Sequence, residues 1–419
     1  MSSGARHKMF AFGWLNFSAA DMKRTKEAIA ELKSQGSIDE LGISIIRDGF
    51  ADMLFPGLNV MQTSLKYFLL IPAMMHQIEK TLEIRENEDI QYPFREQLID
   101  MECVFCDKAC DIAPNLPGII GKDSAEERNH AKRMVRFPHD IYWHGMDIFG
   151  LLPGNSSSMR SFCDGVRERK KITDDEAKRN PKRPWGDVFK IYNDVPLIPV
   201  PDPGNPEKTN PLALTLEEYD FLKKKILRSE DVKGTALETM LNNADFPMLN
   251  EAGSAQDIRK VFCAFGDKAV QAADFGIFMR CAFLAYNIAY LMYCGDHDNK
   301  IAEYYKEIYE LHRQVTDTIP SDFGFERKKG ETLKAMMKFH EYLRNVIPPE
   351  PQPEIQKMMT DWEKAAGKRL CHLKITDPRP EKNEWIGMEF LDFRYNTAVR
   401  LFADYIGKGE NDGTLSETR

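Results

Sequence analysis

The sequence has few cysteines, and its first residues do not resemble a secretory leader. Cysteine accounts for 8 of the 419 residues, far below the density of small proteins that are held together by disulfide bonds. The first residues of the chain contain no apolar run of the kind that a signal peptide needs. We therefore expect a cytoplasmic protein.

Two further features are missing: an excess of charge of one sign, and a long uncharged apolar run. The chain has 57 Lys and Arg against 65 Asp and Glu, a formal net charge of -8, which argues against a surface built throughout for binding phosphate. The most apolar stretch, residues 276–294, contains Arg280 and Asn287, whereas a membrane span needs about 20 mostly uncharged residues. We expect a buried core helix here and no membrane contact.

The motifs of several common enzyme classes are absent as well. The sequence contains no Gly-x-Ser-x-Gly, no phosphate-binding loop, no dinucleotide fingerprint and no His-Glu-x-x-His. These absences disfavour an ATPase or a dehydrogenase. Without such a motif the sequence names no reaction, and we expect no cofactor.

Helical periodicity dominates what is present. Hydrophobic residues make up 42% and charged residues 29% of the chain, with a mean hydropathy of -0.46, which is typical of a folded soluble protein. The chain exceeds the roughly 250–300 residues at which one core stops growing. We predict a mainly α protein of two helical lobes, with at most a small peripheral β element.

A dense run of prolines predicts the boundary between the lobes. Eight of the 23 prolines fall between Pro181 and Pro211, too close together for a helix or a sheet ladder to continue. The expected parts are an N-terminal helical lobe (1–171), a proline-rich connector or arm (172–211), a C-terminal helical lobe (212–406) and a disordered tail (407–419).

The apolar spacing also predicts individual helices. Thr215, with Glu218 three residues later, forms a capping-box pattern that opens a helix, whereas Pro72 predicts a kink or a break in another. Expected helices include residues 39–54, 64–85, 94–111, 139–149, 215–228, 255–294 (broken near Gly266 or Gly276) and 385–406, and the strand-like stretches are 8–14 and 187–200.

Two groups of residues have the composition of a metal site. Cys103, Cys106 and Cys110 have spacings found in zinc and iron–sulfur sites, but the same spacing is one face of a helix, and no fourth ligand lies nearby in the sequence. The Asp-His-Asp run at 296–298 is explained more simply as a solvated turn. We expect no metal.

A basic segment contrasts with the acidic chain. Between Arg160 and Lys190 there are ten basic and six acidic residues, a net charge of +4, and Trp185 and Tyr192 could stack on bases beside them. A solvated helix of mixed charge that runs into a loop explains the same pattern. The residues of the nucleic-acid hypothesis are Arg160, Arg167, Arg169, Lys170, Lys171, Lys182, Arg183 and Trp185.

Polar residues flank the turn Phe55-Pro56-Gly57, next to the very apolar segment 65–75. Polar groups at the edge of a core must be paired. They therefore either tie two helix ends together as a structural network or line a pocket. The residues concerned are Arg47, Asp48, Gln62, Thr63, Lys66 and Tyr67.

Several short blocks form a more specific pattern over most of the chain. They are Phe12–Leu15, Asp39–Ile43, Phe55–Gly57, Gln62-Thr63 with Tyr67-Phe68, Phe137–Trp143, and Leu391–Tyr395 with Asp404. Together they resemble an uncharacterised bacterial domain-of-unknown-function family. Ser64 and Lys66 stand where arginines are more usual in that pattern, which removes one anion-binding donor and the bidentate geometry of another.

The resemblance implies a role but no chemistry. Members of that family are encoded beside helicases and phospholipase-D-like nucleases in antiviral defence clusters, which implies helicase or nuclease subunits as partners. We expect a non-catalytic accessory subunit of a bacterial antiviral defence or nucleic-acid-processing complex, with nucleic acid as an additional contact. The alternatives are a purely structural adaptor, and an enzyme of unrecognised type that acts on nucleic acid or nucleotides, with a site near Arg47–Tyr67 and His139, Tyr142 and Trp143.

Overall fold

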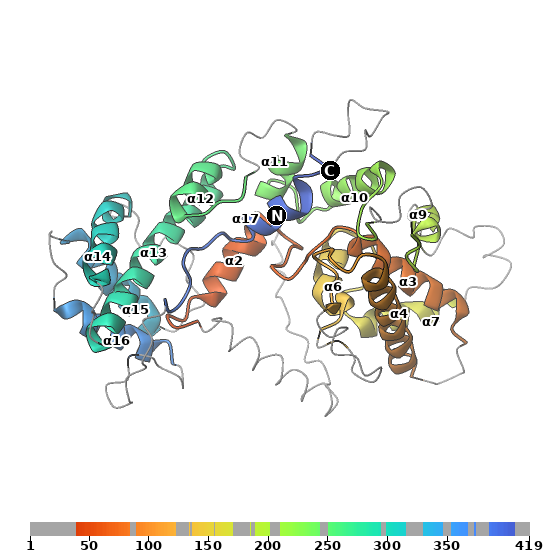
Figure 1. The fold of residues 1–419 in the computed structure, drawn as a ribbon, viewed down its shortest axis with the longest axis horizontal. Coiled ribbons are helices and arrows are strands. Elements are labelled where there is room, and N and C mark those ends of the chain that lie inside the picture. Colours follow the sequence, from red (N-terminus) through yellow and green to blue (C-terminus); the bar gives the residue numbers. More distant parts are fainter. Residues whose placement is uncertain are drawn as a thin grey trace, which may run out of the picture. The chain divides into compact units, whose positions relative to one another are not determined.

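The computed structural model shows a mainly α protein, as the periodicity predicts. It describes residues 39–83, 89–122, 134, 136–154, 156–170, 185, 189–201, 210–243, 250–294, 299–315, 330–346, 353–367, 373 and 385–406. These residues form fourteen α-helices and one 3-10 helix and contain no strand (Figure 1). All of them belong to one unit, Asp39–Arg419.

One group of helices, called here the α3 group, packs around a central helix. Its members are Tyr67–Thr81 (α3), Gln91–Ile112 (α4), Pro138–Ile148 (α6), Met159–Lys170 (α7) and Phe189–Asp194 (α9). Helix α3 contacts α4, α6 and α9, and α4 contacts α7. Residues 67–76 of α3 are all buried because this part of the helix is almost entirely apolar.

Helix α3 continues through Pro72, so the predicted break does not occur there. A proline inside a helix removes one hydrogen bond to the preceding turn. The buried neighbours of Pro72 on every face of α3 offset that loss, because the packing of this helix stabilises it more than a single backbone bond does.

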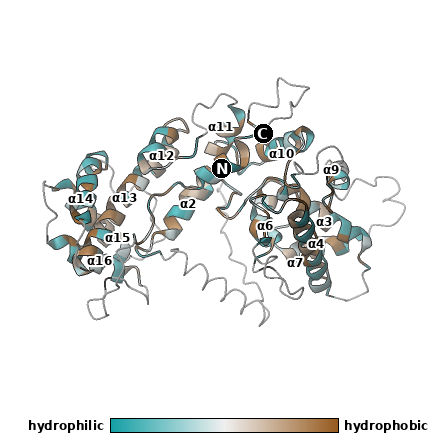
Figure 2. Ribbon diagram, viewed as in Figure 1, coloured by the Kyte–Doolittle hydropathy of each residue, from teal (hydrophilic) through white to brown (hydrophobic). Residues whose placement is uncertain are grey.

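A second group, the α13 group, is organised around the longest helix. Its members are Ala255–Phe262 (α12), Asp267–Cys294 (α13), Lys300–Leu311 (α14), His312–Gln314 (η3), Gly330–Arg344 (α15) and Glu354–Ala365 (α16). Helix α13 contacts α12, α14, η3 and α16, and apolar residues predominate along it in Figure 2. It is long and apolar enough to cross a membrane, but 89% of its most apolar window is buried inside the protein.

The predicted break in this stretch occurs at the first of the two candidate glycines. Gly266 has φ +90°, in the left-handed region that favours glycine, and separates α12 from α13. Helix α13 passes through Gly276, where a Cβ atom would lie 3.5 Å from the ring of Phe393.

The helix predicted for 385–406 is largely wrong. Only Tyr395–Phe402 is helical (α17). Phe393 and Arg394 both have positive φ, at 50° and 71°, a conformation that costs a residue with a side chain of order 1–3 kcal/mol and cannot belong to a right-handed helix. The apolar spacing of 385–394 arises because this extended segment is packed on α13 and α2, not because it is helical.

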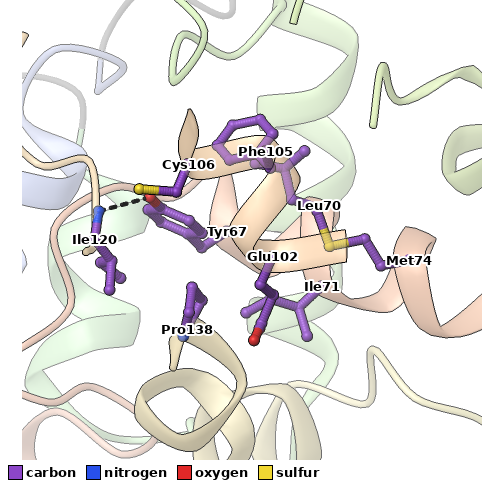
Figure 3. Close-up of a pocket in the computed structure, with 9 residues that line it drawn as sticks. All are labelled: Tyr67, Leu70, Ile71, Met74, Glu102, Phe105, Cys106, Ile120 and Pro138. Carbon is purple, nitrogen blue, oxygen red and sulfur yellow. Dashed lines mark hydrogen bonds between the residues drawn. The ribbon is translucent and has the colours of Figure 1, made fainter. Parts of the chain in front are cut away.

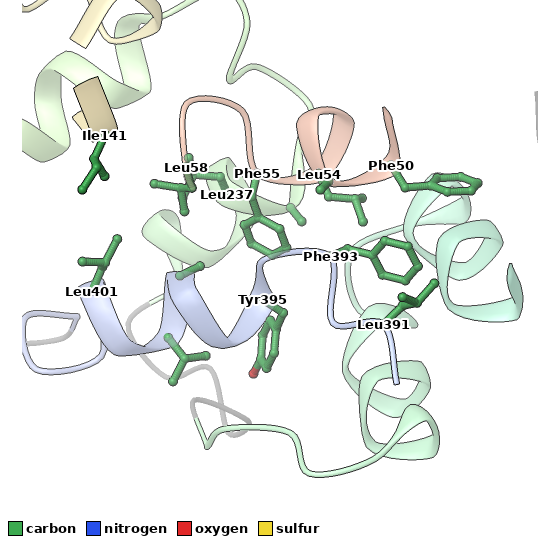
Figure 4. Close-up of a cluster of buried hydrophobic side chains, with 14 of the residues drawn as sticks. Phe50, Leu54, Phe55, Leu58, Ile141, Leu237, Leu391, Phe393, Tyr395 and Leu401 are labelled. Carbon is green, nitrogen blue, oxygen red and sulfur yellow. The ribbon is translucent and has the colours of Figure 1, made fainter. Parts of the chain in front are cut away.

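Residues from distant parts of the chain meet in one apolar cluster. Helices Ser44–Leu54 (α2) and Ala236–Asn242 (α11) contribute to it together with α17, and Leu216–Arg228 (α10) precedes α11 in the chain. Figure 4 shows Leu58 and Ile141 with Leu401 of α17, and Phe55 with Tyr395. Helix α2 contacts α13, so the N-terminal part of the described chain packs on helices that lie far along the sequence.

Two local predictions have clear outcomes. The capping box is confirmed: Thr215 accepts a hydrogen bond from Glu218 N, and the Glu218 side chain accepts one from Thr215 N. The strand-like stretch 187–200 instead contains helix α9. The other strand-like stretch, residues 8–14, lies outside the described residues.

Candidate functional site

Tyr142 fixes the start of helix α3. Its buried hydroxyl accepts hydrogen bonds from the backbone N–H groups of Thr63 at 2.8 Å and Ser64 at 3.0 Å, and donates to Ser64 O at 2.9 Å. Burial raises the pKa of Tyr142 to about 12, so the phenol is neutral at physiological pH. These three bonds use the one hydroxyl proton and both lone pairs of the oxygen.

Thr63 and Tyr67 hold a second segment against the same helix end. Thr63 Oγ1 donates to Gly118 O at 2.7 Å, and the Tyr67 hydroxyl accepts from Ile120 N at 2.9 Å. Burial also raises the pKa of Tyr67. The two side chains therefore satisfy backbone groups of residues 118–120, which lie more than fifty positions along the chain.

Gln62 closes the turn that precedes α3. Its Nε2 donates to Gly57 O at 3.1 Å, and its Oε1 accepts from Asn59 N at 3.1 Å. Gly57 has φ +77°, and a Cβ atom there would lie 2.8 Å from the ring of Phe149, so both the backbone and the packing require glycine. Arg400 of α17 donates to Gln62 O at 3.0 Å.

Lys66 and Glu218 form a buried ion pair between α3 and α10. Lys66 Nζ lies 2.6 Å from Glu218 Oε1, and both side chains are at most one-tenth exposed. The other carboxylate oxygen of Glu218 accepts from Thr215 N as part of the capping box. An anion at Lys66 would have to displace Glu218, and Ser64 Oγ already donates to Leu212 O at 3.1 Å.

Arg47 and Asp48 lie apart from this network. They are neighbours on α2, where Arg47 Nε donates to Asp48 Oδ1 at 2.9 Å. Arg47 also contacts the sulfur of Met388 at 3.6 Å. Within the described part of the chain no hydrogen bond or ion pair joins these two residues to Gln62, Thr63 or Tyr67, so the six polar residues do not converge on one site.

A buried pair that the sequence did not reveal lies beside Tyr67. Glu102 of α4 accepts from the backbone N–H of His139 at 2.7 Å and faces its ring Nδ1 at 2.8 Å. His139 follows Pro138, the first residue of α6, so the carboxylate also faces the positive end of that helix. Asp140 Oδ1 lies 3.4 Å from His139 Nε2.

The surroundings of the pair shift the pKa values of both partners in the same direction. Burial by itself lowers the pKa of His139, but the Glu102 carboxylate and its hydrogen bond more than offset this effect, so the pKa lies above its usual value. Burial raises the pKa of Glu102, against the opposing effect of His139. Both shifts favour a bound proton.

The cavity beside this pair is small. It has a volume of about 10 Å³, room for about one water molecule. Figure 3 shows it between α3, α4 and the start of α6, with Tyr67, Glu102 and Cys106 among its lining residues. The arrangement can hold a proton and a water molecule, but the cavity is too small for a nucleotide.

Glu102 could have been found from its position in the sequence. The buried face of α4 includes Phe94, Leu98 and Cys106, and Glu102 falls on the same stripe at a spacing of four residues. A carboxylate on an apolar stripe must find a partner. The sequence does not show which partner, because His139 is 37 positions away.

Trp143 supports the loop after α6. Its indole Nε1 donates to Ser156 O at 2.9 Å, and the ring packs edge-on against Phe162. Trp143 thus belongs to the scaffold of the α3 group, although it is next to Tyr142 in the sequence.

The structure corrects the stacking part of the nucleic-acid hypothesis. The Trp185 side chain is 5% exposed and packs on His76, Phe162 and Tyr192. Tyr192 is also buried, and its hydroxyl donates to Leu151 O at 2.7 Å. Both rings are part of the core because they are the large apolar groups of an otherwise polar segment, so neither is available to bases.

The basic residues of this segment divide into three kinds. Arg169 forms a bidentate ion pair with Glu79, with both distances at 2.8 Å, and Lys170 Nζ donates to Leu82 O. Arg160 is exposed and Arg167 half-buried. The remaining candidates, Lys171, Lys182 and Arg183, lie outside the described residues.

The cysteine cluster lies along one side of α4. Cys106 is buried and Cys103 and Cys110 are half-buried. Among the residues that the structure describes, no group of three or more His, Cys, Asp or Glu is placed to hold a metal ion. The Asp-His-Asp run at 296–298 lies outside the described residues.

The comparison with protein families agrees with the resemblance over the first part of the chain. Residues 9–185 match the model of a family described as a family of unknown function (DUF6361). The match includes Tyr142, Glu102 and His139 and ends before the block Leu391–Tyr395. No curated protein and no solved structure matches the chain.

Proposed function

We propose that this protein is a non-catalytic accessory subunit of a bacterial antiviral defence or nucleic-acid-processing complex, and that it works in the cytoplasm through protein partners. The genomic part of this proposal is supported by the resemblance, since members of that family are encoded beside helicases and nucleases. The match of residues 9–185 to a family of unknown function is consistent with it.

The proposal that the protein is non-catalytic rests on one observation. The side chains that could have formed a polar site, Thr63, Tyr67 and Tyr142, are bonded to backbone groups of the protein itself. Lys66 is bonded to Glu218. A group that already holds the scaffold cannot bind a substrate without disrupting the fold, so these residues favour a structural network over a pocket.

A nucleic-acid contact would act through phosphates and not through bases. Among the described basic residues of the segment, Arg160 is exposed, and Arg167 is half-buried and lies 3.9 Å from Asp164; phosphate contacts need charge but no stacking. Lys171, Lys182 and Arg183 complete this part of the proposal. We expect binding that weakens steeply with salt and shows no base preference.

The decisive experiment is purification of the tagged full-length protein from its native host. We expect helicase or nuclease subunits in fixed stoichiometry, and isolated protein without nuclease or nucleotide-consuming activity. Recovery of the protein alone, together with a robust activity of the isolated chain, would contradict the proposal. Partners without any nucleic-acid binding at low salt would instead favour a purely structural adaptor.

A second candidate function rests on the Glu102–His139 pair. A carboxylate that orients a histidine and holds its proton is the arrangement used for general acid–base catalysis, and this pair is buried with a raised pKa at His139. In that case the His139→Gln variant would fold normally and lose activity on nucleic acid or nucleotides. A variant that loses stability instead identifies the pair as part of the scaffold.

A further inference from the structure

Residues 385–390 form a strap over helix α13, called here the latch. Glu389 is exposed and the other residues of the latch are half-buried. The chain that follows is anchored separately, because Leu391 and Phe393 are buried and the ring centroid of Phe393 lies 5.7 Å from that of Phe50 (Figure 4). The latch can therefore leave α13 while this anchor and helix α17 stay in place.

Side chains of α13 hold the latch by its main chain. Asn287 Nδ2 donates to Ile386 O at 2.8 Å, and Asn287 Oδ1 accepts from Ile386 N at 2.9 Å. Arg280 Nη1 donates to Glu389 O at 2.7 Å. Within the described part of the chain no backbone–backbone hydrogen bond involves residues 385–390. The contacts resemble those of a bound peptide, in which main-chain hydrogen bonds provide affinity.

The two residues that hold the latch are positioned by groups outside it. Asn287 Nδ2 also donates to Phe283 O, one turn earlier in α13, at 2.8 Å. Arg280 forms a bidentate ion pair with Glu307 of α14, with distances of 2.6 and 2.9 Å. A binding surface whose side chains are already fixed loses little conformational entropy when a ligand binds. The groove formed by α13 and α14 is therefore preorganised.

Two further contacts select the residues that the groove accepts. The Trp385 ring lies 4.8 Å from the Arg280 guanidinium and 5.5 Å, edge-on, from the Tyr304 ring. Gly387 has φ +86°, and a Cβ atom there would lie 2.7 Å from the Phe283 ring, so this position requires glycine. Trp385 Nε1 donates to Gly387 O at 3.1 Å and closes the bend. The groove thus selects a tryptophan followed two residues later by a glycine.

We propose that the groove of α13 and α14 is a peptide-binding site, that the latch is its resident occupant, and that a segment of a partner protein with the same Trp-x-Gly bend replaces the latch. This inference rests on the proposed function for the existence of a protein partner, whereas the groove can be tested without one. Because the latch fills the groove, it lowers the affinity for the partner in proportion to the fraction of molecules in which the groove is open.

The test measures the binding of a fluorescent peptide of residues 383–391 to full-length protein by anisotropy. Trp385→Ala weakens the latch and leaves the groove unchanged, and Tyr92→Ala is the matched control, because Tyr92 is 71% exposed on α4. We expect Trp385→Ala to bind the peptide at least about tenfold more tightly than wild type does, and the control to bind within about twofold of wild type. Both variants should unfold cooperatively in urea.

Changes in the peptide test the groove without altering the protein. Replacement of the peptide's tryptophan by alanine, or of its glycine by valine, should weaken binding to the Trp385→Ala protein at least about tenfold. Replacement of its glutamate at position 389 by glutamine should change binding by less than about twofold, because the Glu389 side chain is exposed. If Trp385→Ala does not fold, Trp385→Phe replaces it: the variant keeps a ring, loses the hydrogen bond to Gly387 O, and should still bind the peptide more tightly than wild type does.

The partner recovered from the native host connects the groove with the proposed function. It should bind Trp385→Ala more tightly than wild type, and the peptide should displace it. A partner that the peptide does not displace uses another surface, which would overturn the inference and leave the proposed function intact.

Three other outcomes would contradict the inference. The groove is not a peptide site if folded Trp385→Ala does not bind the peptide, and the latch does not close it if this variant and wild type bind equally. Dimers of the wild type that the peptide dissociates would assign the groove to a second copy of the chain. If no partner copurifies with the wild type, the proposed function fails and the inference fails with it, whatever the affinity for the peptide.

Discussion

The α3 group and the α13 group hold their helices together by different means. In the α3 group charged side chains enter the core in pairs, such as Glu102 with His139, and Lys66, directly before α3, pairs with Glu218 of the neighbouring α10. In the α13 group the centre is an apolar helix with nineteen buried residues, and the ion pairs described there, such as Arg280 with Glu307, are partly exposed.

The difference shows how each group obtains a unique arrangement. Apolar packing stabilises in proportion to the area buried but tolerates many arrangements. A buried charge must meet one particular partner, because the free energy of an unpaired buried charge is high. We infer that buried ion pairs specify the α3 group, whereas the shape of apolar side chains largely specifies the α13 group, with the buried hydrogen bond from the Tyr286 hydroxyl to Glu363 (2.6 Å) as one polar constraint.

The largest expected effect lies in the α13 group. Trp362 is fully buried, contacts the rings of Phe278 and Phe339, and donates from Nε1 to Leu41 O at 3.1 Å. Trp362→Ala should lower the free energy of unfolding by about 4–5 kcal/mol in urea titrations, through the cavity and the lost hydrogen bond. The exposed neighbour Lys364→Ala should change it by less than about 0.5 kcal/mol.

A somewhat smaller loss is expected when one charge of the α3 group is left alone. Lys66→Met should cost about 3–4 kcal/mol, because it leaves the Glu218 carboxylate buried without its cation. Lys66→Met/Glu218→Gln should recover more than half of that loss in the same titrations, since glutamine can still accept from Thr215 N. If the double variant is no more stable than the single one, the charge is not the cause.

The pH dependence of stability gives a third comparison. Burial, with a smaller effect of Lys80, lowers the pKa of His76 to about 4. The contribution of neutral His76 to the free energy of unfolding is therefore complete above pH 6.5. It is lost as the pH falls from 6.5 towards 4, because between these values only the unfolded chain binds a proton at His76. The loss should be on the order of 3 kcal/mol.

Urea titrations at pH 7.5, 5.5 and 4.5 measure this loss, with His76→Gln as the comparison. The variant should lose less stability than wild type over this range, since it has no histidine to titrate at position 76. If the free energy of unfolding falls by the same amount with pH in both proteins, His76 does not cause the loss.

The smallest effect expected concerns a single hydroxyl. Tyr142→Phe leaves the N–H groups of Thr63 and Ser64 and the carbonyl of Ser64 without their partner, which should cost about 2 kcal/mol in thermal or urea unfolding. Tyr92→Phe is the matched control, because Tyr92 is 71% exposed. If both variants lose the same amount of stability, the Tyr142 hydroxyl does not stabilise the network.

Much of the helical structure could be predicted because it depends on local patterns. The capping box at Thr215 and the break at Gly266 use residues within one or two turns of each other. The helix predicted for 385–406 is absent over 385–394 for the opposite reason. Its apolar residues face α2 and α13, and the left-handed turn at Phe393 and Arg394 is imposed by that packing.

The sequence predicted which residues form the candidate site but not which groups they bond to. The sequence identified Thr63, Tyr67 and Tyr142 as polar residues beside a core, yet their partners are backbone groups of other segments. Glu102 was missed because its partner is distant in sequence. The nucleic-acid hypothesis requires an exposed Trp185, but its large apolar ring lies in the core.

By itself the sequence determined that this protein is mainly α and that several helices begin and end at definite residues. Both properties follow from apolar spacing, proline and glycine, which act over a few residues. Only the tertiary structure decided which charges are paired, which aromatic rings are buried and which apolar side chains remain in water. Those outcomes depend on segments that meet only after folding, as Lys66 and Glu218 do across 152 positions.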